Sequence, residues 1–304
     1  MELATPAPMD VLLRPAALAR AWMGPGRDQE TIAVPGVVLG PGEVLVRVEL
    51  VTITEDDIAI TDGEEQCPVP TVLGREFVGR VAALGGAVAA ADGIPLELGE
   101  RVVSAVGPHE RIGAHRELVG GFATHVHLVT GTPIVRVGEA LPACILAPVS
   151  GAVARAAGLV RRLEEIADPE DLLVTIAGTG ADPLVLAAMI AERGGRARLA
   201  SADPRVRARA ERFGAALAPE HVPETDLSAR FRTASEASPE TTLRVGVPTS
   251  ADLEAAVAFM RAPGTRRYPF ADLVSTPLPL DRLDDAIELA RSGRHLRVAI
   301  APGA

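Results

Sequence analysis

The chain has 304 residues, is 48% hydrophobic and carries a formal net charge of −10, which suits one large or two medium domains and argues against a nucleic acid or an anionic membrane as a partner. The N-terminus has no charged segment followed by an apolar run, and the most apolar stretch (143–160) contains Gly, Pro and Arg, so we expect a cytoplasmic protein without a secretory leader or a membrane span. The only two cysteines, Cys67 and Cys144, are too few for a disulfide framework or a cysteine-based zinc site.

The first half of the chain has β-type patterning. Residues 1–18 show no strong pattern and are interpreted as a mobile extension or an added helix. Apolar runs and apolar/polar alternation, interrupted by glycine-containing turns, predict strands within 21–34, 44–53, 72–84, 98–103 and 120–128. The last of these places His125 and His127 on one face; without a third ligand they do not suggest a metal site, although one of them facing a cleft is a candidate acid or base.

The second half alternates between helix and strand patterns, beginning with a predicted helix at 148–165. The stretch 172–195 combines an apolar run, a turn containing Gly178 and Gly180, and a segment rich in Ala, Leu and Met. Strand, glycine turn and helix in this order open a doubly wound nucleotide-binding domain.

Weaker elements follow this unit. Strands are predicted at 196–200, 242–247 and 296–300, and helices at 204–213, 250–261 and 280–292, with Ser250 as the N-cap of the second helix. Residues 215–240 are polar and broken by proline, and we interpret them as a connection.

The order of short motifs resembles the medium-chain dehydrogenase/reductase superfamily, the relatives of zinc alcohol dehydrogenases. The resemblance runs from residue 21 to 302 and rests on the glycine turn and on 41–48, 73–79, 99–102, 121–123, 210–215 and 279–300. It implies an α/β fold with a GroES-like catalytic domain (1–147 and 265–304) and a shortened, Rossmann-like doubly wound domain (148–264). An active-site cleft is expected between the two domains.

The chain departs from the zinc-dependent members at the metal positions. Thr54, Arg75 and Gly151 stand where those members carry a Cys, a His and a third ligand. Zinc needs thiolate, imidazole or carboxylate donors, so we expect no metal. Quinone- and enoyl-reductase-like relatives work without one, and redox activity is therefore not excluded.

The glycine turn also departs from the family pattern. Gly178 and Gly180 are retained as expected cofactor-binding residues, but Pro183 replaces the third glycine and Asp182 precedes it. We expect Asp182 to be the N-cap and Pro183 the first helical residue. A carboxylate beside a diphosphate is repulsive, and Pro183 removes an N–H donor, so cofactor binding is expected to be weakened.

Three more positions bear on the cofactor. Ser201 replaces the acid that would hold the ribose 2′-hydroxyl, and together with Arg205 it predicts NADP. The alternative is that Ser201 only ends a strand and Arg205 is a surface residue without a role in binding. Arg297 aligns with a basic residue that contacts the pyrophosphate in some relatives; the alternative is a salt bridge with Glu76. By the resemblance, two βα units are missing after residue 215, and in relatives such units carry the nicotinamide half of the site.

The resemblance places these side chains around or behind the floor of the cleft, as candidate catalytic residues: Thr54, Asp56, Asp57, Arg75, Glu76 and Ser150. Arg75 is a candidate for binding an anionic substrate group, or it fills the metal void by pairing with Glu76, Asp56 or Asp57. Asp56 and Asp57 suggest a general base, or a solvated acidic turn with one buried structural aspartate.

Three functions remain open. The best-supported interpretation is a zinc-independent, NADP-dependent oxidoreductase acting on a small molecule, in specialised metabolism by analogy with the family. The alternatives are a cofactor-independent lyase, isomerase or cyclase on the same scaffold, and a non-catalytic relative that binds a ligand or a partner. A homodimer through the strand at 242–247 is expected, because an exposed edge strand invites two-fold pairing.

Overall fold

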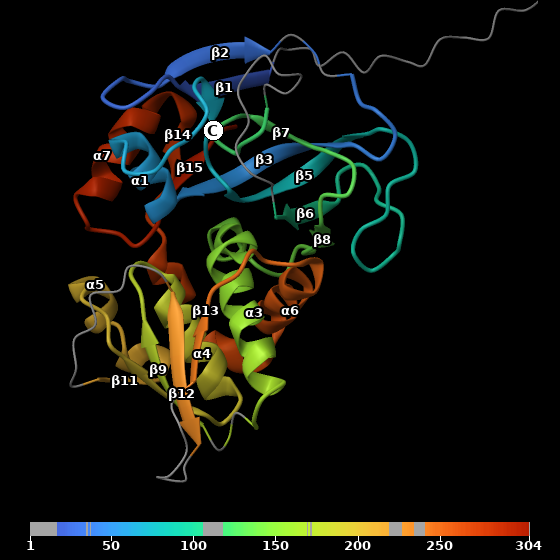
Figure 1. The fold of residues 1–304 in the computed structure, drawn as a ribbon. Coiled ribbons are helices and arrows are strands. Elements are labelled where there is room, and N and C mark those ends of the chain that lie inside the picture. Colours follow the sequence, from blue (N-terminus) through green and yellow to red (C-terminus); the bar gives the residue numbers. More distant parts are fainter. Residues whose placement is uncertain are drawn as a thin grey trace, which may run out of the picture.

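The computed structural model describes residues 17–34, 36, 38–105, 118–168, 170, 172–218, 227–233 and 241–303. They form a β domain and an α/β domain, which lie one above the other in Figure 1. The predicted combination of a β domain with a shortened doubly wound domain is confirmed. Most of the segment that we interpreted as an extension (1–16) lies outside the described residues, and the strand pattern begins at Ala17.

The β domain is built on a sheet with the strand order β14-β15-β3-β5-β6-β8, in which β7 also pairs with β3. A second sheet has the order β2-β1-β4, and helices α1 (Glu55–Asp62) and α7 (Leu283–Arg291) pack against one another. The strands are β1 (Ala17–Trp22), β2 (Glu30–Val34), β3 (Val44–Ile53), β4 (Thr71–Val72), β5 (Glu76–Leu84), β6 (Arg101–Ser104), β7 (His125–Leu128), β8 (Ile134–Arg136), β14 (Leu278–Pro279) and β15 (Val298–Ala301).

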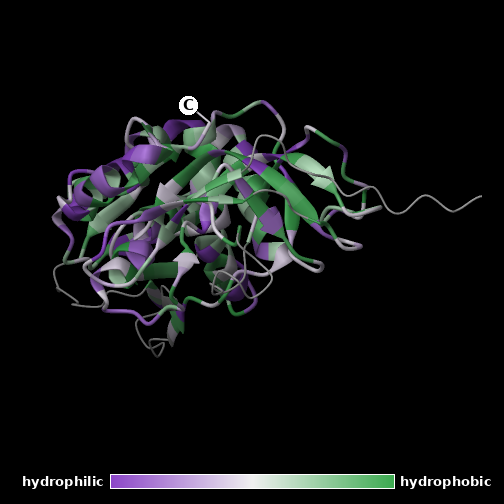
Figure 2. Ribbon diagram, turned by 90° about the horizontal axis from the view of Figure 1, so that it is seen from above, coloured by the Kyte–Doolittle hydropathy of each residue, from purple (hydrophilic) through white to green (hydrophobic). Residues whose placement is uncertain are grey.

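Burial explains why this sheet forms. Most side chains of β3 and β5 are buried, and these two strands pair along most of their length. Figure 2 shows the strands as mostly hydrophobic and the outer helices with hydrophilic turns. Since β15 pairs with β3 from Ile53 to Val51, the sheet joins segments almost 250 residues apart and brings Arg297, the residue before β15, next to the start of α1.

The α/β domain contains a five-stranded sheet of order β11-β10-β9-β12-β13. The strands β9 (Leu172–Ala177), β10 (Arg196–Leu199) and β11 (Ala215–Leu217) are parallel. The strands β12 (Ser228–Thr233) and β13 (Thr241–Arg244) are both antiparallel to their neighbours. The sheet therefore keeps the first half of a doubly wound domain and replaces the second half by an antiparallel pair.

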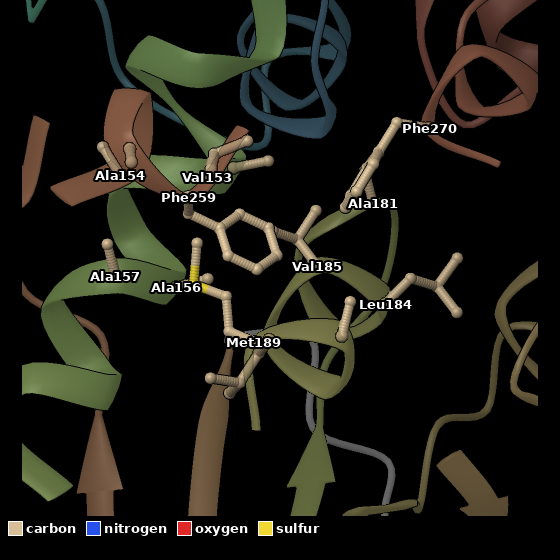
Figure 3. Close-up of a cluster of buried hydrophobic side chains, with 14 of the residues drawn as sticks. Val153, Ala154, Ala156, Ala157, Ala181, Leu184, Val185, Met189, Phe259 and Phe270 are labelled. Carbon is tan, nitrogen blue, oxygen red and sulfur yellow. The ribbon is translucent and has the colours of Figure 1, made fainter. Parts of the chain in front are cut away.

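Three helices pack together in this domain: α3 (Ala152–Glu164), α4 (Asp182–Glu192) and α6 (Ser250–Arg261). Figure 3 shows Ala154, Ala156 and Ala157 of α3 close to Val185 and Met189 of α4. Small side chains on α3 let the helix backbones approach, and buried residues such as Phe259 fill the remaining space.

Several local predictions need correction. The predicted helix at 148–165 is interrupted at Gly151, which separates the short helix η1 (Ala147–Ser150) from α3; another short helix, α2 (Ala143–Leu146), precedes η1. The predicted helix at 204–213 is one turn, α5 (Pro204–Arg207), followed by η3 (Glu211–Phe213). Helix α6 is capped by Thr249, not Ser250, because Thr249 and Asp252 form a capping box.

Strand β12 lies in the segment that we interpreted as a connection. It pairs with β9 along its whole length, and Ala229 opposite Ile176 is fully buried. In the described part of this sheet no further parallel strand follows β11, and an antiparallel strand takes the place beside β9. The predicted strand at 242–247 corresponds to β13, which ends at Arg244.

Among the described residues, no single helix combines the length and apolar character needed to cross a membrane. The segments Ala143–Ser150 and Ala152–Glu164 meet these criteria only together, as a pair bent by 54°.

Candidate functional site

The glycine turn between β9 and α4 faces the β domain at helix α1. Gly178 and Gly180 have φ values of 138° and 69°, a region that favours glycine. A Cβ atom on Gly180 would lie 2.2 Å from Oε1 of Glu55. The carboxylate of Glu55, the first residue of α1, therefore lies directly against the turn.

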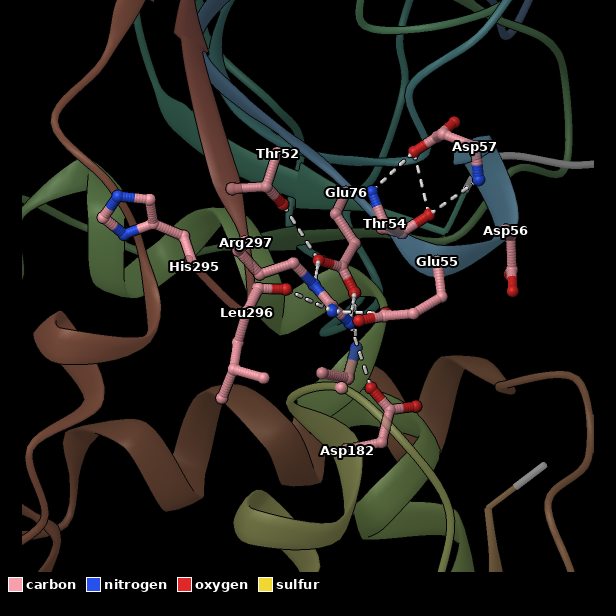
Figure 4. Close-up of polar contacts among 12 residues, drawn as sticks. Thr52, Thr54, Glu55, Asp56, Asp57, Glu76, Asp182, His295, Leu296 and Arg297 are labelled. Carbon is pink, nitrogen blue, oxygen red and sulfur yellow. Dashed lines mark hydrogen bonds and ion pairs between the residues drawn. The ribbon is translucent and has the colours of Figure 1, made fainter. Parts of the chain in front are cut away.

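Arg297 connects this carboxylate to both domains (Figure 4). Its side chain is fully buried, and Nη1 lies 2.5 Å from Glu55 Oε2, Nε 2.8 Å from Glu76 Oε2 and Nη2 3.1 Å from Asp182 Oδ1. Burial alone would lower the pKa of Arg297, but the three carboxylates hold it well above its ordinary value. The salt bridge with Glu76 that we considered as the alternative role of Arg297 is confirmed.

A second arginine approaches from α3. Arg155 Nε donates a hydrogen bond to Asp182 Oδ2 at 2.6 Å, and its terminal nitrogens lie 3.8 Å from Glu76 and 3.7 Å from Asp56. Burial would raise the pKa of Asp182, but Arg155 and Arg297 lower it below its ordinary value. Asp182 is thus an ion-pair partner between the domains.

The prediction that Asp182 is the N-cap of α4 is therefore wrong. The helix begins at Asp182, its N-cap is Ala181 without a side-chain hydrogen bond, and Pro183 follows in the first turn. A carboxylate at this position commonly caps the helix. The Asp182 carboxylate instead pairs with Arg155 and Arg297, because two charged partners outweigh one capping hydrogen bond.

Glu76 is the most enclosed acid of this group, with a side chain only 1% exposed. Besides Arg297, it accepts hydrogen bonds from Thr52 Oγ1 at 2.9 Å and from the N–H of Ala152 at 2.8 Å. A Cβ on Gly151 would lie 2.1 Å from Glu76 Oε1. The glycine at the former third metal position therefore makes room for this carboxylate.

Thr54 and Asp57 form the capping box of α1. Asp57 is almost fully buried and accepts hydrogen bonds from the N–H and the hydroxyl of Thr54 and from the N–H of Gly74, at 2.9, 2.8 and 3.1 Å. Burial raises the pKa of Asp57 to about 6, although these hydrogen bonds act to lower it. This geometry matches the structural aspartate that we considered as the alternative to a general base.

Arg75 has no such partner in the parts of the chain that the structure describes. It forms no ion pair with Glu76, Asp56 or Asp57, and its Nε is buried without a hydrogen-bond acceptor. Ser150 Oγ donates to the carbonyl oxygen of Arg75 at 3.4 Å. The structure thus brings Ser150 beside Arg75, and anion binding by Arg75 stays a prediction.

The two residues of the NADP prediction are engaged within the protein. Ser201 is fully buried; its hydroxyl donates to the carbonyl of Gly178 at 2.6 Å and accepts from the N–H of Asp203 at 3.1 Å. Arg205 Nη2 pairs with Asp203 Oδ2 at 2.7 Å, and Nη1 donates to the carbonyl of His295 at 3.0 Å. A 2′-phosphate at Arg205 would have to compete with Asp203.

A cavity of about 260 Å³ adjoins the network at Glu55, between α1, Arg205 and the segment that links α7 to β15, with His295 in its wall. A larger cavity of about 540 Å³ lies between β8 and α6. It is not lined by the glycine turn or by any predicted site residue. His125 and His127 do not face the crevice: β7 pairs with the opposite half of β3, and His127 Nε2 lies 2.9 Å from Glu43.

The chain is similar to known alcohol and threonine dehydrogenases. The alcohol dehydrogenase GroES-like domain model matches residues 40–153. L-threonine 3-dehydrogenase of Rhizobium johnstonii is 30% identical over 207 residues, 62% of this chain and 56% of that protein. The enzyme of the same name from Mesorhizobium japonicum is 38% identical over 76 residues, 24% of this chain and 22% of that protein. The matches thus span less than two thirds of these curated relatives.

Solved structures match over more of the chain. An alcohol dehydrogenase from Thermotoga maritima superposes with a TM-score of 0.74 at 16% identity, covering 94% of this chain and 99% of that chain. A putative zinc-binding dehydrogenase from Sinorhizobium meliloti, bound to NADP, gives 0.69 at 17% identity, covering 95% and 100%. The chain thus has the fold of the medium-chain dehydrogenase/reductase superfamily, and its residues 40–153 match the alcohol dehydrogenase GroES-like domain.

The zinc site of this superfamily does not fit the side chains present here. The Thr54 hydroxyl is bonded to Asp57, Arg75 offers a cation, and Glu76 fills the space against Gly151. Zinc is bound by thiolate, imidazole or carboxylate. Nowhere in the described residues do three His, Cys, Asp or Glu side chains lie close enough to hold a metal ion.

A dinucleotide, which this superfamily implies, does not fit against the glycine turn while the Glu55 carboxylate lies there. In a doubly wound domain the diphosphate lies against the glycine turn, at the N-terminus of the following helix. Here the Glu55 carboxylate occupies the space above Gly180, and Asp182 forms ion pairs in the first turn of α4. No reaction step through a nicotinamide follows from this geometry.

Two central residues were missed at the sequence level. Glu55 was not singled out beside Asp56 and Asp57, and Arg155 was noted only as an arginine within an apolar stretch. Glu55 meets Arg297 across 242 positions, and Arg155 meets Asp182 across 27. A charge inside a helix that is otherwise buried, as at Arg155, was the available signal, because such a charge needs a partner.

Proposed function

We propose that the chain is a zinc-independent oxidoreductase that acts on a small molecule of specialised metabolism, with NADP(H) as its redox partner. The observation that carries the proposal is the retained strand–glycine turn–helix unit, which faces helix α1 of the β domain. Arg297 and Arg155 converge beside this turn, and these cations would favour an anionic ligand once the Glu55 carboxylate turns away. The curated relatives, which are dehydrogenases, support the same reaction class.

A second candidate function is supported by the side chains that fill the space beside the glycine turn. Glu55, Asp182, Arg155 and Arg297 satisfy one another without a ligand, and β12 replaces a parallel strand beside β9. A scaffold with these features suits cofactor-independent proton-transfer chemistry, such as a lyase, isomerase or cyclase reaction. In this candidate, Arg75 would bind an anionic group of the substrate.

Ligand-induced stabilisation distinguishes the two candidates. If NADP(H) is the redox partner, NADPH at several millimolar should raise the free energy of unfolding, by about 2.7 kcal/mol where it reaches 100 times its Kd. NADH and ADP-ribose serve as comparisons in the same thermal unfolding series. Stabilisation by NADPH beyond that by NADH supports the first candidate; no stabilisation by any of the three contradicts it and leaves the cofactor-independent enzyme.

We also propose a homodimer that forms through the edge of the α/β sheet. Within the described segments β13 pairs only with β12, and Val247, shortly after this edge, is 91% exposed. An unpaired edge with an exposed apolar residue suits two-fold pairing with a second copy.

Val247→Glu is expected to shift the protein from dimer to monomer, because it places a charge against its own copy across the two-fold axis. Light scattering after size exclusion should give twice the chain mass of 31.6 kDa for the wild type and the chain mass for the variant. Ile94→Glu, at an exposed apolar residue between β5 and β6, is the control and should remain dimeric. A wild type that is monomeric at all concentrations contradicts the proposal.

A further inference from the structure

We infer that Glu55 is an internal occupant of the anion position at the glycine turn, and that it competes there with phosphate-bearing ligands, which bind only when Glu55 turns outward. The inference concerns binding, not turnover, so it does not rest on the proposed redox activity.

The first support is the position of the Glu55 carboxylate. One oxygen lies 2.2 Å from where a Cβ on Gly180 would be, and the other lies 2.5 Å from Arg297 Nη1. Because Gly180 has no Cβ, a side chain from the other domain has room here, while the N–H of Gly180 itself donates to Asp203 Oδ2 at 3.5 Å. Figure 4 shows Glu55 extending from α1 toward Arg297 and Asp182.

The charge balance gives the second support. Arg155 and Arg297 face Glu55, Glu76 and Asp182, so the carboxylates outnumber the guanidinium groups. A diphosphate added beside these acids would be repelled. Without Glu55, the two arginines would be balanced by Glu76 and Asp182.

The exposed fraction of each side chain indicates which of the three carboxylates can turn away from the arginines. The side chains of Glu76 and Asp182 are 1% and 10% exposed, whereas that of Glu55 is 36% exposed and borders the 260 Å³ cavity. Glu55 can therefore turn outward without opening the core, while the Arg297–Asp182 contact still joins the domains. This makes Glu55 the displaceable member of the network.

The test compares binding of inorganic pyrophosphate and of ADP-ribose to the wild type, Glu55→Ala and Glu55→Gln by isothermal titration calorimetry. We expect both variants to bind at least one of these probes at least tenfold more tightly than the wild type. Glu64→Gln is the matched control, because it removes a carboxylate from the wall of the same cavity but not from the glycine turn. Its affinity should equal that of the wild type.

Circular dichroism and thermal unfolding establish that the variants are folded, and Glu55→Gln retains the shape of the side chain if the alanine variant is unstable. Folded variants that bind both probes no better than the wild type would overturn the inference, as would an equal gain in Glu64→Gln. A gain in affinity confined to the Glu55 variants supports the inference even when the wild type shows no NADPH-dependent activity. The failure of the proposed function is therefore distinguishable from the failure of this inference.

Discussion

Replacing Arg297 with leucine is expected to lower the free energy of unfolding by about 3–5 kcal/mol, the usual cost of removing one partner from a buried ion pair. The guanidinium group faces Glu55, Glu76 and Asp182 and is fully buried. Its loss leaves Glu76, which is itself buried, without its main counter-ion. Urea unfolding at neutral pH, followed by circular dichroism, measures the change.

Arg282→Leu is the matched control for this prediction. Arg282 pairs with Asp285 at 2.8 Å, but both side chains are more than half exposed, and exposed pairs contribute about 0–1 kcal/mol. If Arg297→Leu costs no more than Arg282→Leu, the buried network does not hold the domains together.

Asp57→Ala is expected to cost about 3 kcal/mol or more at acidic pH. The substitution leaves the N–H and hydroxyl of Thr54 and the N–H of Gly74 without their acceptor, and each unsatisfied buried group costs about 1–3 kcal/mol. Equilibrium unfolding of wild type and variant at a series of pH values measures this cost.

The cost of Asp57→Ala should decrease as the pH rises. Because the pKa of Asp57 is raised from 3.8 to about 6 in the folded protein, the folded state binds more protons than the unfolded state between these values. The stability that protonated Asp57 contributes is complete below pH 3.8 and is lost as the pH passes about 6, a change of about 3 kcal/mol for a shift of this size. Asp56→Ala, at a half-exposed neighbour, should show no comparable step; a cost of Asp57→Ala that is independent of pH would contradict this assignment.

Apolar patterning predicted the elements that build the two cores. The runs at β3 and β9 and the apolar face of α7 specify burial locally, so they were visible in the sequence. Strand β12 was not visible, because its sequence, SARFRT, carries two arginines and a short apolar alternation. Its pairing with β9 depends on the rest of the sheet, which overrides local preference.

The side chains of the candidate site were harder to predict from local sequence patterns than the strands and helices. The Arg297–Glu76 pair was anticipated because an alignment of motifs placed both residues on the floor of the cleft. The roles of Glu55, Arg155 and Asp182 depend on contacts between domains, which no local pattern specifies. Asp182 illustrates the conflict, since the local rule for a helix start and the tertiary ion pairs compete for one carboxylate.

The insertion of β15 between β14 and β3 has a consequence for the order of folding. The strands β9, β10 and β11 lie between Leu172 and Leu217, so only short loops have to close before they pair. In contrast, β3 pairs with β15, which lies almost 250 residues later in the sequence. Contacts of such long sequence separation form slowly. The Arg297 network is therefore a late event of folding, and until it forms the two domains are joined only by their shared chain and their apolar contacts.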